Sequence, residues 1–211
     1  MFASLLRMAT KYGFSDVRNQ LIKDLEGAYP TKWDNFKSAK ALGEQVFGST
    51  KPHPNTVLNL LEEQKVKFAI PFAAYRASIG GFQTLMSDKP GTVLSHRTLF
   101  NTTQGLLNLS TAASHLARIV AYRGHLSVCP DETCTLNVDI NAGEVRMQAL
   151  EKVYFTMIGE REGGLLSPPF LKHILCTKCV MQMEASHNNW GSLFWENLPS
   201  AFNLACSWAV L

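Results

Sequence analysis

Apolar residues recur at helical spacing along almost the whole chain, and this pattern constrains the fold more than any other feature. Val17, Leu21, Leu25 and Ala28 stand at i, i+4, i+8 and i+11, which places them on one helix face. Comparable patterns predict helices over residues 5–12, 34–47, 68–79, 94–122 and 179–195, with others after Asn55 and around 147–158. Strand-like alternation is confined to residues 135–140. The sequence therefore predicts an all-α protein, a multi-helix array with little or no β-structure.

Polar residues beside these segments predict where the helices begin. Ser15, Asp34 and Asn55 each precede an apolar-periodic run, which is the place of an N-cap. Glu63 stands four residues before Lys67, a spacing at which a carboxylate and an ammonium group form a surface pair on a helix. We expect both features in the folded protein.

Two of the helices carry faces that are expected to point inward. The helix at 94–122 has two such faces, formed by Leu99, Thr103, Leu106 and Leu107, and by Ala113, Leu116, Ala117 and Val120. The inner face of the terminal helix consists of Val180, Met183, His187, Trp190 and Phe194. The last turn and the tail supply a predicted anchor that folds back on the helical array: Trp190, Phe194, Trp195, Leu198 and Phe202.

Length and composition bound the possible classes of protein. A chain of 211 residues with 46% apolar residues forms one ordinary domain or two small ones, and the Gly- and Pro-containing linker at 48–54 separates residues 1–50 from 51–211. A net charge of +3, with scattered Lys and Arg, does not predict a nucleic-acid surface. The chain has no apolar run long enough to span a membrane and a poor signal peptide, so we expect a cytoplasmic or nuclear protein.

Four of the five cysteines form two short-spaced pairs that together could hold a metal ion. Cys129 and Cys134 are separated by four residues in an irregular insert, and Cys176 and Cys179 by two residues just before the terminal helix. Four thiolates match the tetrahedral coordination that zinc prefers. The alternative is four reduced thiols, of which two pack as small apolar groups. A redox CxxC is less favoured because no βαβ pattern surrounds the pair.

Histidines are weaker candidates for this zinc site. His187 follows Cys179 by eight residues, which is about 12 Å of rise on a continuous helix and too far to share one ion. His125 and His173, each just before a cysteine pair, are reserve ligands. The fifth cysteine, Cys206, lies in an apolar tail and is expected to pack in the core.

No pattern in the sequence predicts catalysis. The chain lacks a Gly-rich phosphate loop, a G-x-S-x-G elbow and an H-E-x-x-H motif. Asp88, Ser95 and His96 are near one another in sequence, but helix caps and a surface histidine explain them without a triad. We therefore expect a protein that is not an enzyme.

Both ends of the chain resemble a known group of proteins. Residues 5–18, from Leu5-Leu6-Arg7-Met8-Ala9 to Val17-Arg18, resemble the helix that ends a BTB/POZ domain and the helix after it. The break at Tyr29-Pro30-Thr31 is similar to one in basidiomycete-type fungal BTB proteins. The C-terminal motifs resemble the tail of the same group: Cys176-x-x-Cys179, Ser186-His187, Phe194-Trp195 and Leu198-Pro199-Ser200-x-Phe202.

The resemblance covers the helical region after the BTB fold but not that fold, which would precede Leu5. It implies a non-enzymatic interaction module, the post-BTB part of an adaptor in ubiquitin-ligase or transcriptional assemblies, with a cullin-type scaffold as a candidate partner. A missing BTB fold also predicts an exposed apolar face on Leu5, Leu6, Ala9 and Tyr12. The alternatives are a stand-alone structural zinc protein and a truncated remnant of a longer gene.

Overall fold

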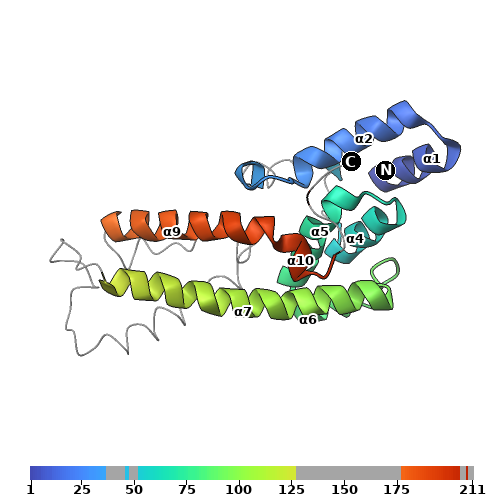
Figure 1. Cartoon of the computed structure of the whole chain (residues 1–211). Coiled ribbons are helices and arrows are strands. Elements are labelled where there is room, and N and C mark those ends of the chain that lie inside the picture. The colour runs from blue at the N-terminus through green and yellow to red at the C-terminus, as the bar shows by residue number, and fades with distance from the viewer. Residues whose placement is uncertain (37–45, 48–51, 127–176, 205–207, 209–211) are drawn as a thin grey trace. The chain divides into compact units, whose positions relative to one another are not determined.

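Every regular element of the described residues is helical. The computed structural model describes residues 1–36, 46–47, 52–126, 177–204 and 208. The N-terminal helices are α1 (Phe2–Tyr12), α2 (Ser15–Ala28), α4 (Pro54–Glu63), a 3₁₀ turn η1 (Lys67–Ala69), α5 (Ile70–Ile79) and α6 (Gly81–Leu85). Next come α7 (His96–Leu126), α9 (Thr177–Glu196) and α10 (Leu198–Ala201) (Figure 1). Within these ranges there is no strand, so the all-α prediction is confirmed. The candidate strand at 135–140 and the helix around 147–158 lie outside the described residues.

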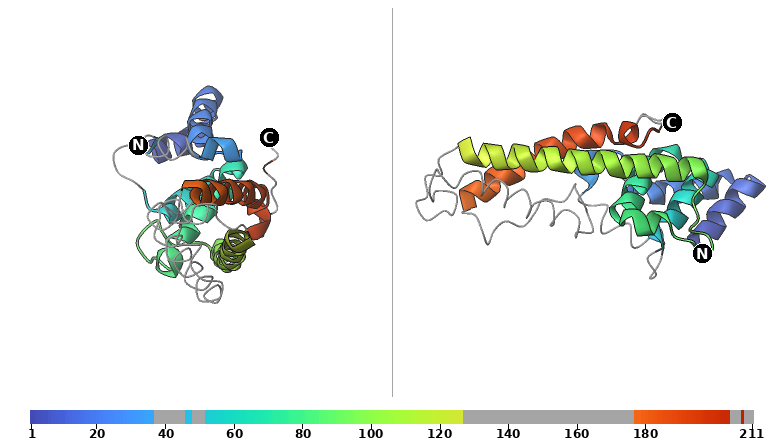
Figure 2. Two further views of the ribbon diagram at one scale, coloured as in Figure 1. Left: turned by 90° about the vertical axis from the view of Figure 1, so that its left-hand side faces the viewer. Right: turned by 90° about the horizontal axis from the view of Figure 1, so that it is seen from below.

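The helices belong to two compact units. One unit comprises Met1–Leu107 and Trp195–Leu211, and the other comprises Asn108–Phe194. The long helices α7 and α9 contribute residues to both units. Figure 1 shows each of them along its length, and Figure 2 shows them from two further directions. The division between residues 50 and 51 stays a prediction.

A sharp turn at Gly13 joins α1 to α2. Gly13 has φ 70°, in the left-handed region that glycine adopts at low cost, and its N–H bonds to the carbonyl of Ala9. The turn places Phe14 at the N-cap position, so Ser15 is already helical and does not cap α2. The Ser15 hydroxyl instead donates to the carbonyl of Gly13 at 3.4 Å. The prediction of Ser15 as a cap is therefore wrong.

The start of α4 also differs from the prediction. His53 is the N-cap, since its Nδ1 accepts the N–H of Asn55, and Pro54 occupies the first turn. The fully buried Asn55 lies inside the helix, where its Nδ2 donates to three carbonyls of the following loop and helix end, those of Thr84, Leu85 and Thr92. Asn55 therefore anchors a distant loop and is not a cap.

The helix expected after Asp34 begins one residue before it. Residues 33–36 are helical, so Asp34 lies within the first turn and is not its cap. The continuation of this predicted helix at 37–45 lies outside the described residues. The predicted helix at 68–79 is confirmed as α5, with Pro71 in its first turn.

Aromatic rings form the centre of the first unit. The ring of Phe72 on α5 lies 5.8 Å from those of Tyr29 and Phe36 and 5.4 Å from that of Trp195. These residues come from the end of α2, the helical turn at 33–36, α5 and the end of α9. Because the rings are in edge-on or tilted contact, they bury a large apolar area with favourable geometry. Segments from both ends of the sequence thus share one core.

The buried face of α7 differs from the predicted one. The predicted face included Leu107, which is 58% exposed, whereas the side chains of Thr98 and Thr102 are buried together with Gly105. Small residues suit this face because α5 and the tail approach it closely. The Ser78 hydroxyl donates to the Thr102 carbonyl, and a Cβ at Gly105 would overlap the ring of Phe202. The second predicted face, at residues 113–120, concerns side chains outside the description.

Candidate protein-interaction surface

The first helix presents an apolar face to solvent beside the face that packs on the protein. Leu5 is 41%, Met8 52% and Tyr12 58% exposed, whereas Leu6 and Ala9 are buried. The predicted exposure of Leu5 and Tyr12 is therefore confirmed, and that of Leu6 and Ala9 is wrong. Leu6 and Ala9 occupy a neighbouring stripe of the helix that the rest of the first unit covers. The name α1 face is used below for Leu5, Met8 and Tyr12.

The apolar surface continues across the turn into α2. The rings of Tyr12 and Phe14 are 6.2 Å apart, and Phe14 is itself exposed. Val17, in the first turn of α2, is also exposed, although the residues of α2 that follow it on its predicted face become progressively buried. Isolated exposed apolar residues are ordinary on protein surfaces, but a contiguous group marks a binding surface more often.

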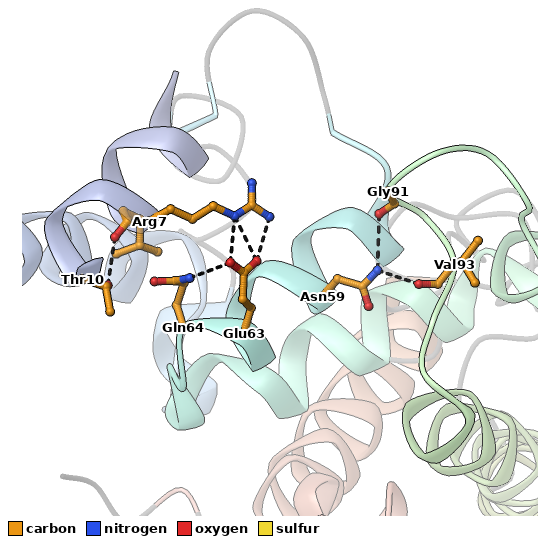
Figure 3. Close-up of polar contacts among 8 residues, drawn as sticks. Arg7, Thr10, Asn59, Glu63, Gln64, Gly91 and Val93 are labelled. Carbon is orange, nitrogen blue, oxygen red and sulfur yellow. Dashed lines mark hydrogen bonds and ion pairs between the residues drawn. The ribbon is translucent and has the colours of Figure 1, made fainter. Parts of the chain in front are cut away.

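A forked ion pair fixes α1 to the end of α4. The guanidinium of Arg7 donates from Nε and Nη2 to the carboxylate of Glu63 at distances of 2.8–3.0 Å (Figure 3). Gln64 adds a hydrogen bond of 3.1 Å to the same carboxylate, and Arg18 of α2 donates to the Gln64 carbonyl at 3.3 Å. Both helices of the hairpin are therefore tied to one point on the protein, which holds the α1 face in place.

This pair replaces the one predicted from sequence. Glu63 is the last residue of α4, and the chain then turns through Lys65, whose φ is 56°. Lys67 lies in the following 3₁₀ turn, so the continuous helix that an i, i+4 pair requires is absent. The hydrogen bond from Arg7 lowers the pKa of the Glu63 carboxyl below its ordinary value, although burial acts in the opposite direction.

The charge on α1 is entirely basic. The helix contains Arg7 and Lys11 and no acidic residue. Glu63 neutralises Arg7, whereas the Nζ of Lys11 lies 5.4 Å from the centre of the Tyr12 ring, next to the α1 face. Within the part of the chain that the structure describes, no carboxylate forms an ion pair with Lys11. The apolar face therefore has an unneutralised cation at its edge.

The side-chain amide of Asn59 holds the loop before α7 against α4. Asn59 donates from Nδ2 to the carbonyls of Gly91 and Val93 at 3.3 and 2.9 Å (Figure 3). At the end of this loop the Ser95 hydroxyl accepts the N–H of Thr98, which makes Ser95 a cap of α7, as the sequence predicted. The Thr98 hydroxyl donates to Glu62 at 2.6 Å. The polar groups here satisfy a helix end, and His96 is exposed beside them.

The cysteine set falls mainly outside the described residues. Cys129, Cys134 and Cys176 lie there, as does the reserve ligand His173, and Cys179 belongs to the first turn of α9. The unbroken helix of α9 confirms the geometry that separates Cys179 from His187. Among the described residues no group of three or more His, Cys, Asp or Glu side chains could hold a metal ion. The four-cysteine zinc site stays a prediction.

The aromatic anchor predicted for the tail is present, but its members divide between two environments. Trp195, Leu198 and Phe202 are buried in the first unit, and the ring of Trp208 stacks on Trp195 at 5.1 Å. In the second unit the rings of Trp190 and Phe194 stack on each other at 4.8 Å and are only partly buried.

Comparison of the chain with protein-family models, with curated proteins and with solved structures finds no match. Among the described residues, none of the helices combines the length and the apolar character needed to cross a bilayer.

Proposed function

We propose that this chain is a non-enzymatic protein-interaction module that binds a partner protein through the α1 face. The observation that carries the proposal is the exposure of Leu5, Met8 and Tyr12 on a helix that packs on the first unit through the buried Leu6 and Ala9. The Arg7–Glu63 pair joins the same helix to the end of α4. Exposing apolar side chains to water is unfavourable by about 25 cal/mol per Å², so a partner that covers this face gains that free energy. A face that is already ordered adds little conformational cost on binding.

The resemblance to fungal BTB proteins suggests the setting of this interaction. The hairpin of α1 and α2 and the buried aromatic tail support a proposed role as the post-BTB part of an adaptor in ubiquitin-ligase or transcriptional assemblies. A cullin-type scaffold is the first partner to test. In this proposal the helical array positions the surface, and no step of chemistry takes place on the chain.

Site-specific photocrosslinking tests the proposal directly. A benzophenone amino acid is introduced at Met8, and in a matched control at Phe100, an exposed residue of α7. We expect irradiation in cells to give a discrete adduct with one protein from position 8, which is lost when Leu5→Asp is added. The same adduct from both positions, or none from position 8 although the protein is folded, would contradict a binding role for the α1 face.

A further inference from the structure

The spacing of the α1 face fits a helix better than any other partner element. Leu5, Met8 and Tyr12 stand at i, i+3 and i+7, which is the seam that one helix offers to another in knobs-into-holes packing. The seam covers about 10 Å of axial rise, or two turns. Met8 adapts its shape to a partner, and Tyr12 contributes a rigid ring with a polar tip. In the described residues there is no strand edge to receive an extended peptide.

The basic residues beside the seam favour an acidic partner. Residues 1–18 contain three basic side chains, Arg7, Lys11 and Arg18, and one acidic side chain, Asp16. Glu63 neutralises Arg7, whereas Arg18 donates to a backbone carbonyl and forms no ion pair with a carboxylate of the described residues. A second copy of the chain packed along the same face would bring basic helices together, since α1 has no acidic residue. An acidic partner would meet Lys11 with opposite charge.

We infer that the α1 face binds an amphipathic helix of another protein, with apolar residues at heptad positions and Asp or Glu beside them. The inference rests on the proposed function and specifies the partner chemistry. The apolar residues of the partner cover Leu5, Met8 and Tyr12, and one of its carboxylates pairs with Lys11. A contact made by so few side chains is smaller than a standard interface of about 800 Å² per partner, so it is weak and transient when isolated.

Two synthetic peptides of about three heptads test the inference. Both carry leucine at the a and d positions; one carries glutamate and the other lysine at the e and g positions, where like charges oppose self-association. Each fluorescent peptide is titrated with the full chain at low ionic strength, and binding is followed by anisotropy. We expect the glutamate peptide to bind about fivefold more tightly than the lysine peptide, because its carboxylates attract Lys11. The difference is small because an exposed ion pair contributes little energy.

Substitutions in the chain separate the apolar and charged contributions. Lys11→Glu should reverse the preference between the peptides, since the attraction becomes repulsion. Met8→Asp should weaken binding of both peptides by about tenfold or more because it places a charge in the seam. Phe100→Asp, a matched change at an exposed apolar position of α7, should leave both affinities unchanged. Far-ultraviolet circular dichroism checks that each variant is folded.

Several outcomes would overturn the inference. These are equal affinity for the two peptides, binding of neither peptide, and an unchanged preference in Lys11→Glu. A dimer in light scattering that Met8→Asp dissociates would assign the α1 face to a second copy of the chain. If the glutamate peptide fails to bind but the benzophenone at Met8 still gives its specific adduct, the proposed function stands and the partner chemistry is wrong. Loss of both results would reject both.

Discussion

The indole Nε1 of Trp195 donates a hydrogen bond of 3.0 Å to the carbonyl of Thr31, a residue 164 positions earlier in the chain. Thr31 is the last residue of the break that ends α2, and Trp195 is the penultimate residue of α9. This hydrogen bond connects the segment that follows α2 in the sequence to the C-terminal end of α9. Trp208 closes the arrangement, because its own Nε1 donates to the carbonyl of Trp195 at 2.6 Å.

Substitution of Trp195 should therefore destabilise the first unit strongly. The indole is 1% exposed and contacts the rings of Phe36 and Phe72. We expect Trp195→Ala to lower the free energy of unfolding by about 3–5 kcal/mol, because it leaves a large cavity. Trp195→Phe keeps part of the ring packing but leaves the Thr31 carbonyl without its donor, for a loss of about 1–3 kcal/mol. Urea unfolding followed by circular dichroism measures both, with Phe100→Ala as an exposed control.

Replacing Gly105 by alanine should change the free energy of unfolding in the opposite direction from the same replacement at an exposed helical glycine. Replacement of glycine by alanine inside a helix ordinarily stabilises by about 0.5–1 kcal/mol, which we expect for Gly27→Ala on the exposed side of α2. At Gly105 the new Cβ would overlap the ring of Phe202, so Gly105→Ala should destabilise by about 1–3 kcal/mol. Adding Phe202→Leu should recover part of that loss. Stabilisation by Gly105→Ala alone would show that the ring does not pack there.

The Arg7–Glu63 pair should contribute little stability and should depend on pH. Both side chains are about half exposed, so a double-mutant cycle with Arg7→Met and Glu63→Gln should give a coupling below about 1 kcal/mol. Because the folded pKa of Glu63 lies below its ordinary value of 4.5, the contribution is complete above that pH and disappears as pH falls through the lowered pKa. Carbon-detected NMR titration of Glu63 should show its pKa rising in Arg7→Met. An unchanged titration would mean that the pair does not persist in solution.

Local sequence patterns predicted which segments form helices, but they predicted helix starts poorly. Helical periodicity identified α5, α7 and α9, because a helix that buries one face carries apolar residues at helical spacing. The caps at Ser15 and Asn55 failed because a cap depends on the path of the preceding chain. At α2 that path is set by the left-handed turn, and at α4 by His53 and Pro54.

Contacts between distant segments explain the remaining differences. The buried face of α7 is determined by Phe202, whose ring lies against Gly105. Phe202 is distant in sequence, so the spacing of residues within α7 gives no information about this contact. The exposed apolar positions on α1 were predicted only in part. The expectation rested on the missing BTB fold, and amphipathic spacing does not define which half of the apolar sector the rest of the chain covers. Arg7 and Glu63 are 56 residues apart, so their pair had no signal in local spacing.

The four-cysteine zinc site predicts a measurable metal content. If Cys129, Cys134, Cys176 and Cys179 bind zinc together, purified protein should contain about one zinc per chain by mass spectrometry, since a structural site fills nearly completely. Cys176→Ser should remove most of the metal, whereas Cys206→Ser should leave it bound. A content under about 0.2 zinc per chain would reject the site and favour four reduced thiols.

Tyr29 should make the first unit sensitive to alkali. Burial raises the pKa of its hydroxyl from 10.0 to about 12, and the neighbouring Arg76 opposes that shift. Since the folded pKa is higher than the unfolded one, the folded state holds the proton more tightly, and stability is complete below pH 10 and falls as pH rises to about 12. Ionisation of Tyr29 should lower the free energy of unfolding by about 2–3 kcal/mol at the upper end of this range. Tyr29→Phe keeps the ring against Phe72 and removes the titrating group, so its free energy of unfolding should decline less between these pH values. Parallel declines in the two proteins, measured by urea unfolding at each pH, would show that Tyr29 does not resist ionisation in the folded state.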